Sequence, residues 1–213
     1  MPIICFEGAS AVGKTTTANA FRSRVGASVV PEVHELYVRP ADETPEWYFE
    51  RQAERWRMAQ EQSGSRRLVV LDGDPFQPLW YNWAYNFDGW QGLDFMERFY
   101  RPRVQNGTMR FPDLYVIFST SESELRARRE MDASRRRRGF ETHLRMIEPQ
   151  RRYFSAMRAI APHRVLFMEA KAIESNVEFI RENVSALEEQ DEQSSAMLFD
   201  RMMEWLRCNT AQS

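Results

Sequence analysis

The sequence predicts an α/β fold in three layers, with a five-stranded parallel sheet between two layers of helices. Short apolar runs, rich in the branched residues that suit strands buried on both faces, alternate with longer amphipathic stretches. This alternation is typical of strand–helix units repeated around a parallel sheet. At 213 residues, of which 43% are hydrophobic, the chain can build one substantial core. The apolar runs predict strands at residues 3–7, 28–30, 68–71, 114–118 and 164–168.

Helices are predicted between these strands. Thr44 can cap, and Pro45 can begin, a helix that runs to about residue 63, and Pro78 can begin a second one. Amphipathic periodicity predicts further helices at 121–132, 140–160 and 173–189.

The C-terminal segment, residues 190–213, predicts an acidic connector followed by one more amphipathic helix. Leu198, Met202 and Trp205 recur there at helical spacing. This apolar face can dock on the body of the protein, which is the favoured interpretation, or it can form the seam of a homodimer. We therefore expect one domain over residues 1–189, with the last helix packed on it.

Composition excludes several classes of function. No apolar run approaches the roughly 20 residues needed to cross a bilayer, so no membrane partner is expected. The net charge of −2 does not predict a nucleic-acid surface, which usually carries a basic excess. Cys5 and Cys208 are too few for a disulfide framework and lack metal-ligand spacing. A cytoplasmic protein is expected.

The strongest chemical signal is GASAVGKT at residues 8–15, which satisfies the phosphate-loop pattern G-x-x-x-x-G-K-[ST] between a predicted strand and a predicted helix. Gly8 and Gly13 allow backbone conformations in which successive amides point at phosphate oxygens. The helix N-terminus adds partial positive charge. Lys14 supplies a full charge, and the Thr15 hydroxyl can ligate Mg²⁺. The predicted nucleotide-binding residues here are Gly8, Ser10, Ala11, Val12, Gly13, Lys14, Thr15 and Thr16.

Three classes of phosphate-loop protein can be weighed against the sequence. A small GTPase carries an N-K-x-D guanine reader near its last strand, whereas this chain has EAKAIES there, with no Asp two positions after Lys171. A ring-forming ATPase needs a second helical domain and extra arginine sensors, for which the chain is short. The remaining class is a small kinase that moves the γ-phosphoryl group of ATP to a bound acceptor.

The segment CFEGASAVGKTTT, residues 5–17, resembles the opening of thymidylate kinases and deoxynucleoside kinases. The resemblance continues through Glu32 after the second strand, Asp72 at the end of the third, and PDLYVIFSTSESELRARR, in which Arg128 matches a lid arginine. It covers roughly residues 1–175. The resemblance implies a sheet ordered 2-3-1-4-5, ATP and Mg²⁺ as cofactors, and a nucleoside or nucleoside monophosphate as the acceptor.

Three positions depart from the pattern of those families. Gly73 stands where they have an arginine after the acidic residue of the third strand. Ser10 stands where thymidylate kinases have an aspartate, and Pro31 followed by Glu32 stands where deoxynucleoside kinases read Glu-Pro. The sequence therefore supports the triphosphate half of the site more strongly than the acceptor half.

Three carboxylates are candidates for the chemistry. Asp72 ends a buried strand at the sheet edge where ligands bind, and it is the predicted Mg²⁺ ligand together with Thr15, unless it is only a cap or turn residue. Glu32 and Asp74 can orient or deprotonate an acceptor hydroxyl, and either could equally be a surface carboxylate. The predicted catalytic residues are Lys14, Asp72, Arg128 and Glu32.

Arginines crowd residues 126–140, which form the predicted lid. A mobile arginine-rich segment can close over phosphates, exclude water and stabilise charge in the transition state. Arg128 and Arg135 are the preferred nucleotide-binding members. Four consecutive arginines, residues 135–138, cannot share one helix face, so some of them meet solvent. A nucleic-acid arm is the competing interpretation, weakened by the lack of interleaved aromatic residues.

Aromatic residues crowd residues 76–87. On a helix, the tryptophans and Phe87 share one face, which predicts core packing. Tyr81 and Tyr85 lie on another face and predict a wall of the acceptor pocket, because rings stack on planar ligands and hydroxyls bind them. Gln52, on the preceding helix, can line the opposite wall.

The sequence thus predicts a kinase that uses ATP and Mg²⁺ to phosphorylate a small-molecule acceptor, with a nucleoside or nucleoside monophosphate as the leading candidate. Two alternatives stay open. One is phosphorylation of another small molecule, such as an antibiotic or metabolite hydroxyl. The other is a nucleotide-binding regulatory protein with little turnover.

Overall fold

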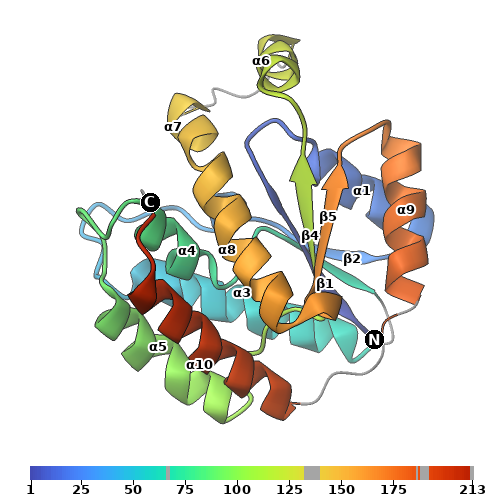
Figure 1. Ribbon diagram of the computed structural model, residues 1–213. Helices are drawn as coiled ribbons and strands as arrows, with labels where there is room; N and C mark the ends of the chain where they lie inside the picture. The colour runs from blue at the N-terminus through green and yellow to red at the C-terminus, as the bar shows by residue number, and fades with distance from the viewer. Residues whose placement is uncertain (66–67, 132–139, 186, 188–191, 212–213) are drawn as a thin grey trace.

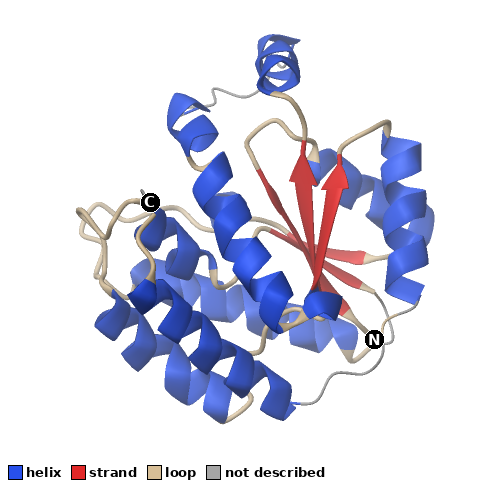
Figure 2. Cartoon of the chain, viewed as in Figure 1, coloured by secondary structure: helices blue, strands red, loops and turns tan. Residues whose placement is uncertain are grey.

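The computed structural model describes residues 1–65, 68–131, 140–185, 187 and 192–211. It confirms the predicted sheet, in which five parallel strands follow the order β2-β3-β1-β4-β5 (Figure 1). Helices cover both faces of this sheet (Figure 2). The observed strands differ from the predicted ones by at most one residue at either end. They are β1 (Ile3–Gly8), β2 (Ser28–Val30), β3 (Val69–Asp72), β4 (Leu114–Ser119) and β5 (Val165–Glu169).

The register of the central strands positions the site. Phe6 of β1 pairs with Asp72 of β3, and Gly8 of β1 pairs with Phe118 of β4. The strands are parallel, so their carboxyl ends meet at one edge of the sheet. The turn that follows β1 therefore lies between the turns that follow β3 and β4.

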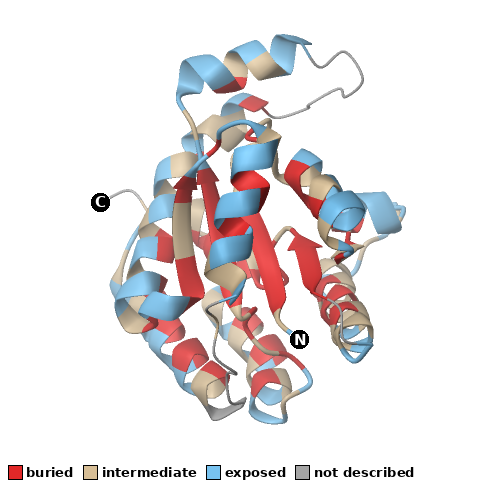
Figure 3. Cartoon of the chain, turned by 90° about the vertical axis from the view of Figure 1, so that its right-hand side faces the viewer, coloured by how far each residue is buried: buried red, intermediate tan, exposed pale blue. Residues whose placement is uncertain are grey.

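The sheet packs between two apolar layers, one on each face, and its strands are therefore buried (Figure 3). Alternate strand residues point to opposite faces. Ile4 and Phe6 pack with Phe21 of the helix after β1, whereas Cys5 and Leu71 face the larger layer on the other side.

The helices largely match the prediction, apart from the short helix α2 (Val33–Leu36), which the sequence analysis does not predict, and three further differences. The described helices are α1 (Lys14–Val25), α2 (Val33–Leu36), α3 (Trp47–Ser63), α4 (Gln77–Ala84), α5 (Leu93–Gln105), α6 (Glu122–Met131), α7 (Phe140–Arg145), α8 (Ile147–Ile160), α9 (Ile173–Ser185) and α10 (Glu192–Cys208). First, α3 begins at Trp47 instead of Pro45, because the Trp47 amide bonds to the carbonyl of Thr44 in a tight turn. Second, the predicted helix at 140–160 divides into α7 and α8 at Met146, whose amide bonds to the carbonyl of His143.

The third difference is α5, which the sequence analysis does not predict. Its apolar side chains Met96, Phe99, Tyr100 and Val104 recur at helical spacing and are buried. Pro102, a residue type that usually ends a helix, lies in its last turn, where the missing amide interrupts little of the helix.

The C-terminal helix α10 packs on α5 and α8. Leu198 and Met202 are buried in the larger apolar layer, and Trp205 packs against Trp83 of α4 with ring centroids 5.0 Å apart. The Trp83 indole N–H also donates to the carbonyl of Asn209 at 2.8 Å. The end of the chain therefore supports the back of α4. Within the described helices, none combines the length and apolar character needed to cross a membrane.

Candidate functional site at the phosphate loop

The phosphate loop turns between β1 and α1 in a conformation that requires its glycines. Gly8 has a φ of +141°, and a Cβ atom added there would lie 2.5 Å from the carbonyl oxygen of Phe118. Gly13 has a φ of +105°, and no side chain caps α1, so the first amides of this helix are left to a ligand. The loop can therefore cradle an anion. Ser10, Ala11 and Val12 lie in the turn itself, and Thr16 lies in the first turn of α1.

Lys14 begins α1 and folds its ammonium group back onto the loop. Nζ donates to the carbonyl oxygens of Gly8 at 2.8 Å and Ala9 at 3.3 Å. Burial raises the pKa of Asp72, and the positive charge of Lys14 opposes that rise. The structure thus brings Lys14 and Asp72 to the same end of the sheet.

Asp72 ends β3 with its side chain buried beside Thr15. The Thr15 hydroxyl lies beside the carboxylate and opposes the rise in its pKa, while Oδ1 has no hydrogen-bond partner among the described residues. Burial raises the pKa of Asp72, as does the nearby carboxylate of Glu32. A buried carboxylate oxygen without a hydrogen-bond partner needs an explanation. A carboxylate oxygen and a hydroxyl, side by side at a phosphate loop, are oxygen ligands of the kind that Mg²⁺ binds.

Glu32 follows β2 and reaches the turn after β3. A Cβ atom on Gly73 would lie 3.5 Å from Glu32 Cγ, so the two positions face each other. His34 Nδ1 lies 3.2 Å from Glu32 Oε2. Burial raises the pKa of Glu32, but the hydrogen bond from His34 and the charge of Lys14 outweigh it and bring the pKa to about 2. Glu32 is therefore ionised and suited to orient a hydroxyl, although it is a weak proton acceptor.

Arg55, which the sequence analysis does not single out, ties the two sides of the site together. Its buried guanidinium donates from Nε to the carbonyl of Pro31 at 2.7 Å. Nη2 donates to the carbonyls of Asp72 at 2.7 Å and Gly73 at 2.9 Å, and Nη1 donates to Gln52 Oε1 at 2.5 Å. These bonds fix the carboxyl ends of β2 and β3 against α3. The sequence feature that could have identified Arg55 is its position three residues after Gln52, because this spacing places both side chains on one helix face.

Gln52 belongs to a chain of polar side chains that leads from α3 to α4. Its Nε2 donates to the Tyr48 hydroxyl at 3.2 Å, and that hydroxyl donates to Oε1 of Gln77. Burial raises the pKa of Tyr48 to about 12, so its hydroxyl stays protonated. Gln52 therefore faces α4 through Tyr48, a residue that sequence reasoning missed.

Tyr81 and Tyr85 lie side by side at the end of α4, with ring centroids 5.1 Å apart. Burial raises the pKa of Tyr81, and the neighbouring Tyr85 adds to the rise. Trp90, from the following loop, packs edge-on against Tyr81 at 5.6 Å, and 44% of its surface is exposed. Tyr48 is close enough to act on the pKa of Tyr81 as well. The rings of Tyr81, Tyr85 and Trp90 form one aromatic wall.

The structure places Asp74 in the interior and not on this wall. The side chain is fully buried, and its Oδ1 accepts from the Phe76 amide at 2.9 Å and the Tyr115 hydroxyl at 2.8 Å. Burial raises the pKa of Asp74 to about 7, with a contribution from the carboxylate of Glu7. Asp74 therefore lies beneath the site.

Glu7, in the F-E-G segment before the loop, is a second buried carboxylate that sequence reasoning did not assign. Its Oε1 accepts from the Asp74 amide at 2.7 Å, and its Oε2 accepts from the Gly8 amide at 3.1 Å and from Gln150 Nε2 at 2.9 Å. Burial raises the pKa of Glu7. Glu7 thus links the phosphate loop, the turn after β3 and α8.

Arg128, on α6, reaches the phosphate loop. Its Nη1 donates to the carbonyl of Val12 at 3.0 Å, and its Nε donates to Glu124 at 2.8 Å. Arg126, two residues earlier, turns outward and pairs with Glu141 at 2.7 Å. The predicted lid residue Arg135 lies outside the described residues.

Comparison with known proteins adds a family and a fold. The family model described as an AAA domain matches residues 3–153. Comparison with curated proteins finds no match. A solved structure of deoxyadenosine kinase from M. mycoides, with the products dCMP and a flexible dCDP bound, matches with a TM-score of 0.54 and 14% identity over 86% of this chain and 98% of that chain. A structure of the same enzyme with dATP bound matches with a TM-score of 0.55 and 14% identity over 86% of this chain and 100% of that one. Likeness at this identity shows a shared fold, and it confirms the fold implied by the resemblance to deoxynucleoside kinases.

Proposed function

The chain belongs to the AAA domain family, and from this premise we propose that it is an ATP- and Mg²⁺-dependent kinase that phosphorylates a nucleoside or a nucleoside monophosphate. The observation that carries the proposal is the unpartnered Oδ1 of buried Asp72, beside the Thr15 hydroxyl at the phosphate loop. The helices after β5 favour a small kinase over a ring-forming ATPase with a separate helical domain. They return to the body, with α9 on α1 and α10 on α5 and α8.

The triphosphate would bind where the uncapped start of α1 meets Lys14. The first amides of α1 would donate hydrogen bonds to phosphate oxygens, and the Lys14 ammonium would move from the loop carbonyls to the outer phosphates. Thr15 and Asp72 would hold Mg²⁺, which when bound neutralises charge on the transferred group. No cluster of three or more His, Cys, Asp or Glu residues in the described part of the chain could hold a metal, so phosphate oxygens and water would complete its shell.

The acceptor would lie between Glu32 and the aromatic wall. The ionised Glu32 would accept a hydrogen bond from the acceptor hydroxyl and aim its oxygen at the γ-phosphorus, because positioning supplies much of the catalysis of phosphoryl transfer. Tyr81 and Tyr85 offer ring faces to a planar base, and the Gln52–Tyr48 chain offers polar groups to its edge. The ring faces suit a planar base and the polar groups suit its hydrogen-bonding edge, so together they favour a nucleoside over a sugar or an amine.

Arg128 would stabilise charge as the phosphoryl group moves. It already contacts the loop through Val12 O, and an arginine near the transferring phosphate can act in the transition state.

A second acceptor class is favoured by one observation. Gly73 offers no side chain where related kinases have an arginine, and the nearby Arg55 donates to Gln52 and to three backbone carbonyls. A hydroxyl acceptor without its own phosphate needs no such arginine. Among nucleotides this favours a nucleoside over its monophosphate, and it also admits a phenolic or aminoglycoside hydroxyl.

The test is an ADP-release assay with MgATP and a panel of nucleosides, nucleoside monophosphates, aminoglycosides and phenols. We expect stimulation by at least one nucleoside, with the matching phosphorylated product seen by mass spectrometry. Stimulation by aminoglycosides or phenols alone would reject the nucleoside assignment. ATP binding without acceptor-dependent turnover across the panel would instead favour a regulatory protein.

A further inference from the structure

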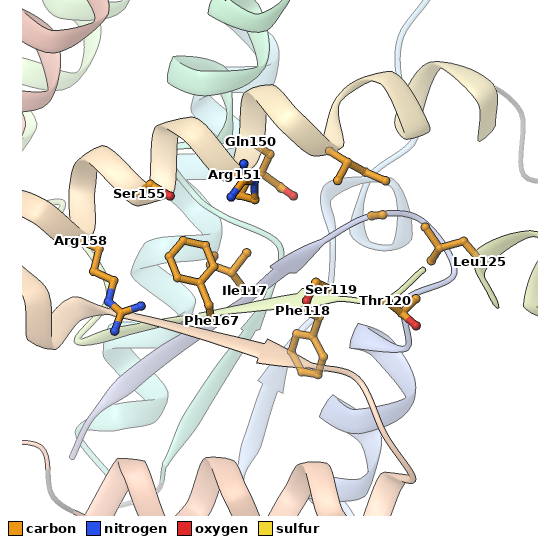
Figure 4. Close-up of a pocket in the computed structure, with 12 residues that line it drawn as sticks. Ile117, Phe118, Ser119, Thr120, Leu125, Gln150, Arg151, Ser155, Arg158 and Phe167 are labelled. Atoms are coloured by element: carbon orange, nitrogen blue, oxygen red, sulfur yellow. The ribbon is translucent and has the colours of Figure 1, made fainter. Parts of the chain in front are cut away.

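A cavity of about 440 Å³ lies between α8 and the carboxyl-terminal halves of β4 and β5 (Figure 4). Its floor is apolar, with Ile117 and Phe167 from the two strands. Along its opposite side α8 presents Gln150, Ser155 and Arg158. This volume lies within the range of small-molecule sites, and the combination of an apolar floor with a few polar groups is typical of them.

The cavity borders the phosphate loop at Ala9, but most of its lining residues lie away from that loop. Ile117 and Phe167 belong to the face of the sheet that α8 covers, whereas α1 and its phosphate-binding amides cover the other face. Arg128 contacts Val12 of the loop and does not line the cavity. Neither Lys14 nor Asp72 is among the lining residues.

The charge of the cavity is positive. Arg158 lies over the Phe167 ring, 5.7 Å from its centroid, and no carboxylate pairs with it among the residues that the structure describes. The lining residues include no aspartate or glutamate. The other lining arginine, Arg151, already pairs with Glu148 at 2.9 Å. A guanidinium beside an aromatic ring is suited to a planar anion, because it binds carboxylate, sulfonate or phosphate oxygens and stacks on flat groups.

We propose that this cavity is a binding site for a small organic anion with a planar apolar body. The anionic group lies at Arg158, and the body packs on Phe167 and Ile117. The inference rests on the cavity alone and does not require kinase activity.

The position of Gln150 gives this site a connection to the phosphate loop. Gln150 lines the cavity and also donates to Glu7 Oε2, the oxygen that accepts from the Gly8 amide. A ligand in the cavity can therefore act on the loop through these two hydrogen bonds as well as through Ala9, which lines the cavity. Any effect of this ligand on MgATP affinity must be matched by an equal effect of MgATP on the ligand.

The experiment uses the full chain and the fluorescent probe 8-anilinonaphthalene-1-sulfonate, which carries a sulfonate on a planar, apolar naphthalene ring. We expect one saturable site, whose Kd rises about tenfold or more in Arg158→Glu, because the charge at the anion is reversed. Ser155→Trp should weaken binding at least as much by filling the cavity from an exposed helix position. Arg181→Glu, an exposed arginine of α9 on the other face, is the matched control and should bind as the unaltered protein does.

Three results would overturn the proposal. They are unchanged affinity in both cavity variants, equal weakening in the Arg181→Glu control, and a probe Kd that rises in proportion to MgATP without a plateau. The last result would place the probe on the phosphate loop. A Kd that is unaffected by MgATP, or that shifts to a plateau, supports a separate site. Circular dichroism checks that each variant is folded.

Discussion

The guanidinium of Arg55 lies 3.9 Å from the position that a Cβ atom on Gly73 would occupy. Resemblance to related kinases leads one to expect an arginine at that turn, and here an arginine from α3 fills the neighbouring space instead. The backbone at Gly73 has a φ of +92°, which side chains rarely adopt, so this turn and the buried arginine fit each other.

Replacement of Arg55 should destabilise the protein. Arg55→Met leaves three backbone carbonyls and Gln52 without their donor in a buried place, which should cost roughly 2–4 kcal/mol of unfolding free energy. Urea denaturation measures the loss. Arg57→Met is the matched control, because Arg57 is exposed and, within the described part of the chain, pairs with Glu61 alone. Equal losses in the two variants would contradict the role given to Arg55.

Lys14→Ala should lower acceptor-dependent turnover at least about tenfold, equivalent to about 1.4 kcal/mol of transition-state stabilisation. The chain provides its own control in Lys171, an exposed lysine whose replacement by alanine should leave turnover unchanged. Steady-state ADP release with both variants decides the matter. Full activity in Lys14→Ala would remove the phosphate loop from the mechanism.

Arg128→Ala should slow kcat more than it weakens ATP binding, if the guanidinium acts on the moving phosphoryl group. The measurement pairs turnover with the Kd for ATP from calorimetry. Arg126→Ala is the neighbouring control, since Arg126 pairs outward with Glu141. A loss confined to ATP affinity would reduce Arg128 to a binding residue.

Glu32→Gln should lower kcat about tenfold or more with the best acceptor, because an amide orients a hydroxyl less well than an ionised carboxylate does. ATP affinity should change little. Glu35→Gln, three residues later on α2, is expected to behave as the unaltered protein. If the two variants have equal turnover, Glu32 has no role in the reaction.

The stability of the protein should fall as pH rises through neutrality because of Asp74. Burial and Glu7 raise its pKa from 3.8 to about 7, so between these values the folded state holds a proton that the unfolded chain has lost. The contribution is fully present below 3.8 and disappears as pH passes about 7. Asp74→Asn should remove this fall in stability, which amounts to a few kcal/mol.

Urea denaturation at about pH 5 and about pH 8 tests this dependence. Asp88→Asn, on an exposed loop, should keep the pH dependence of the unaltered protein. The same slope in Asp74→Asn would mean that another group carries the effect.

The sequence predicted best what is encoded locally. The strands are short apolar runs, and the loop is a contiguous motif, so each could be located to within a residue. Arg55 and Glu7 could not be assigned, because their partners Pro31, Asp72 and Gln150 are distant in the sequence and meet only in the fold. For the same reason, the burial of Asp74 could not be predicted from its position two residues after Asp72.

The aromatic segment shows the same limit. Helical periodicity separated Trp83, which is buried, from Tyr81, which lies on the wall beside Tyr85. Trp90 follows the end of α4 through a loop, where periodicity carries no information, although it completes the same wall.

The contact between Trp83 and Asn209 has a practical consequence for anyone handling the protein. A dye or surface tether attached near Asn209 would lie against the helix that carries Trp83 and Tyr81, and would alter the binding it is meant to report. The amino terminus, at the far end of β1 from the phosphate loop, is the safer point of attachment.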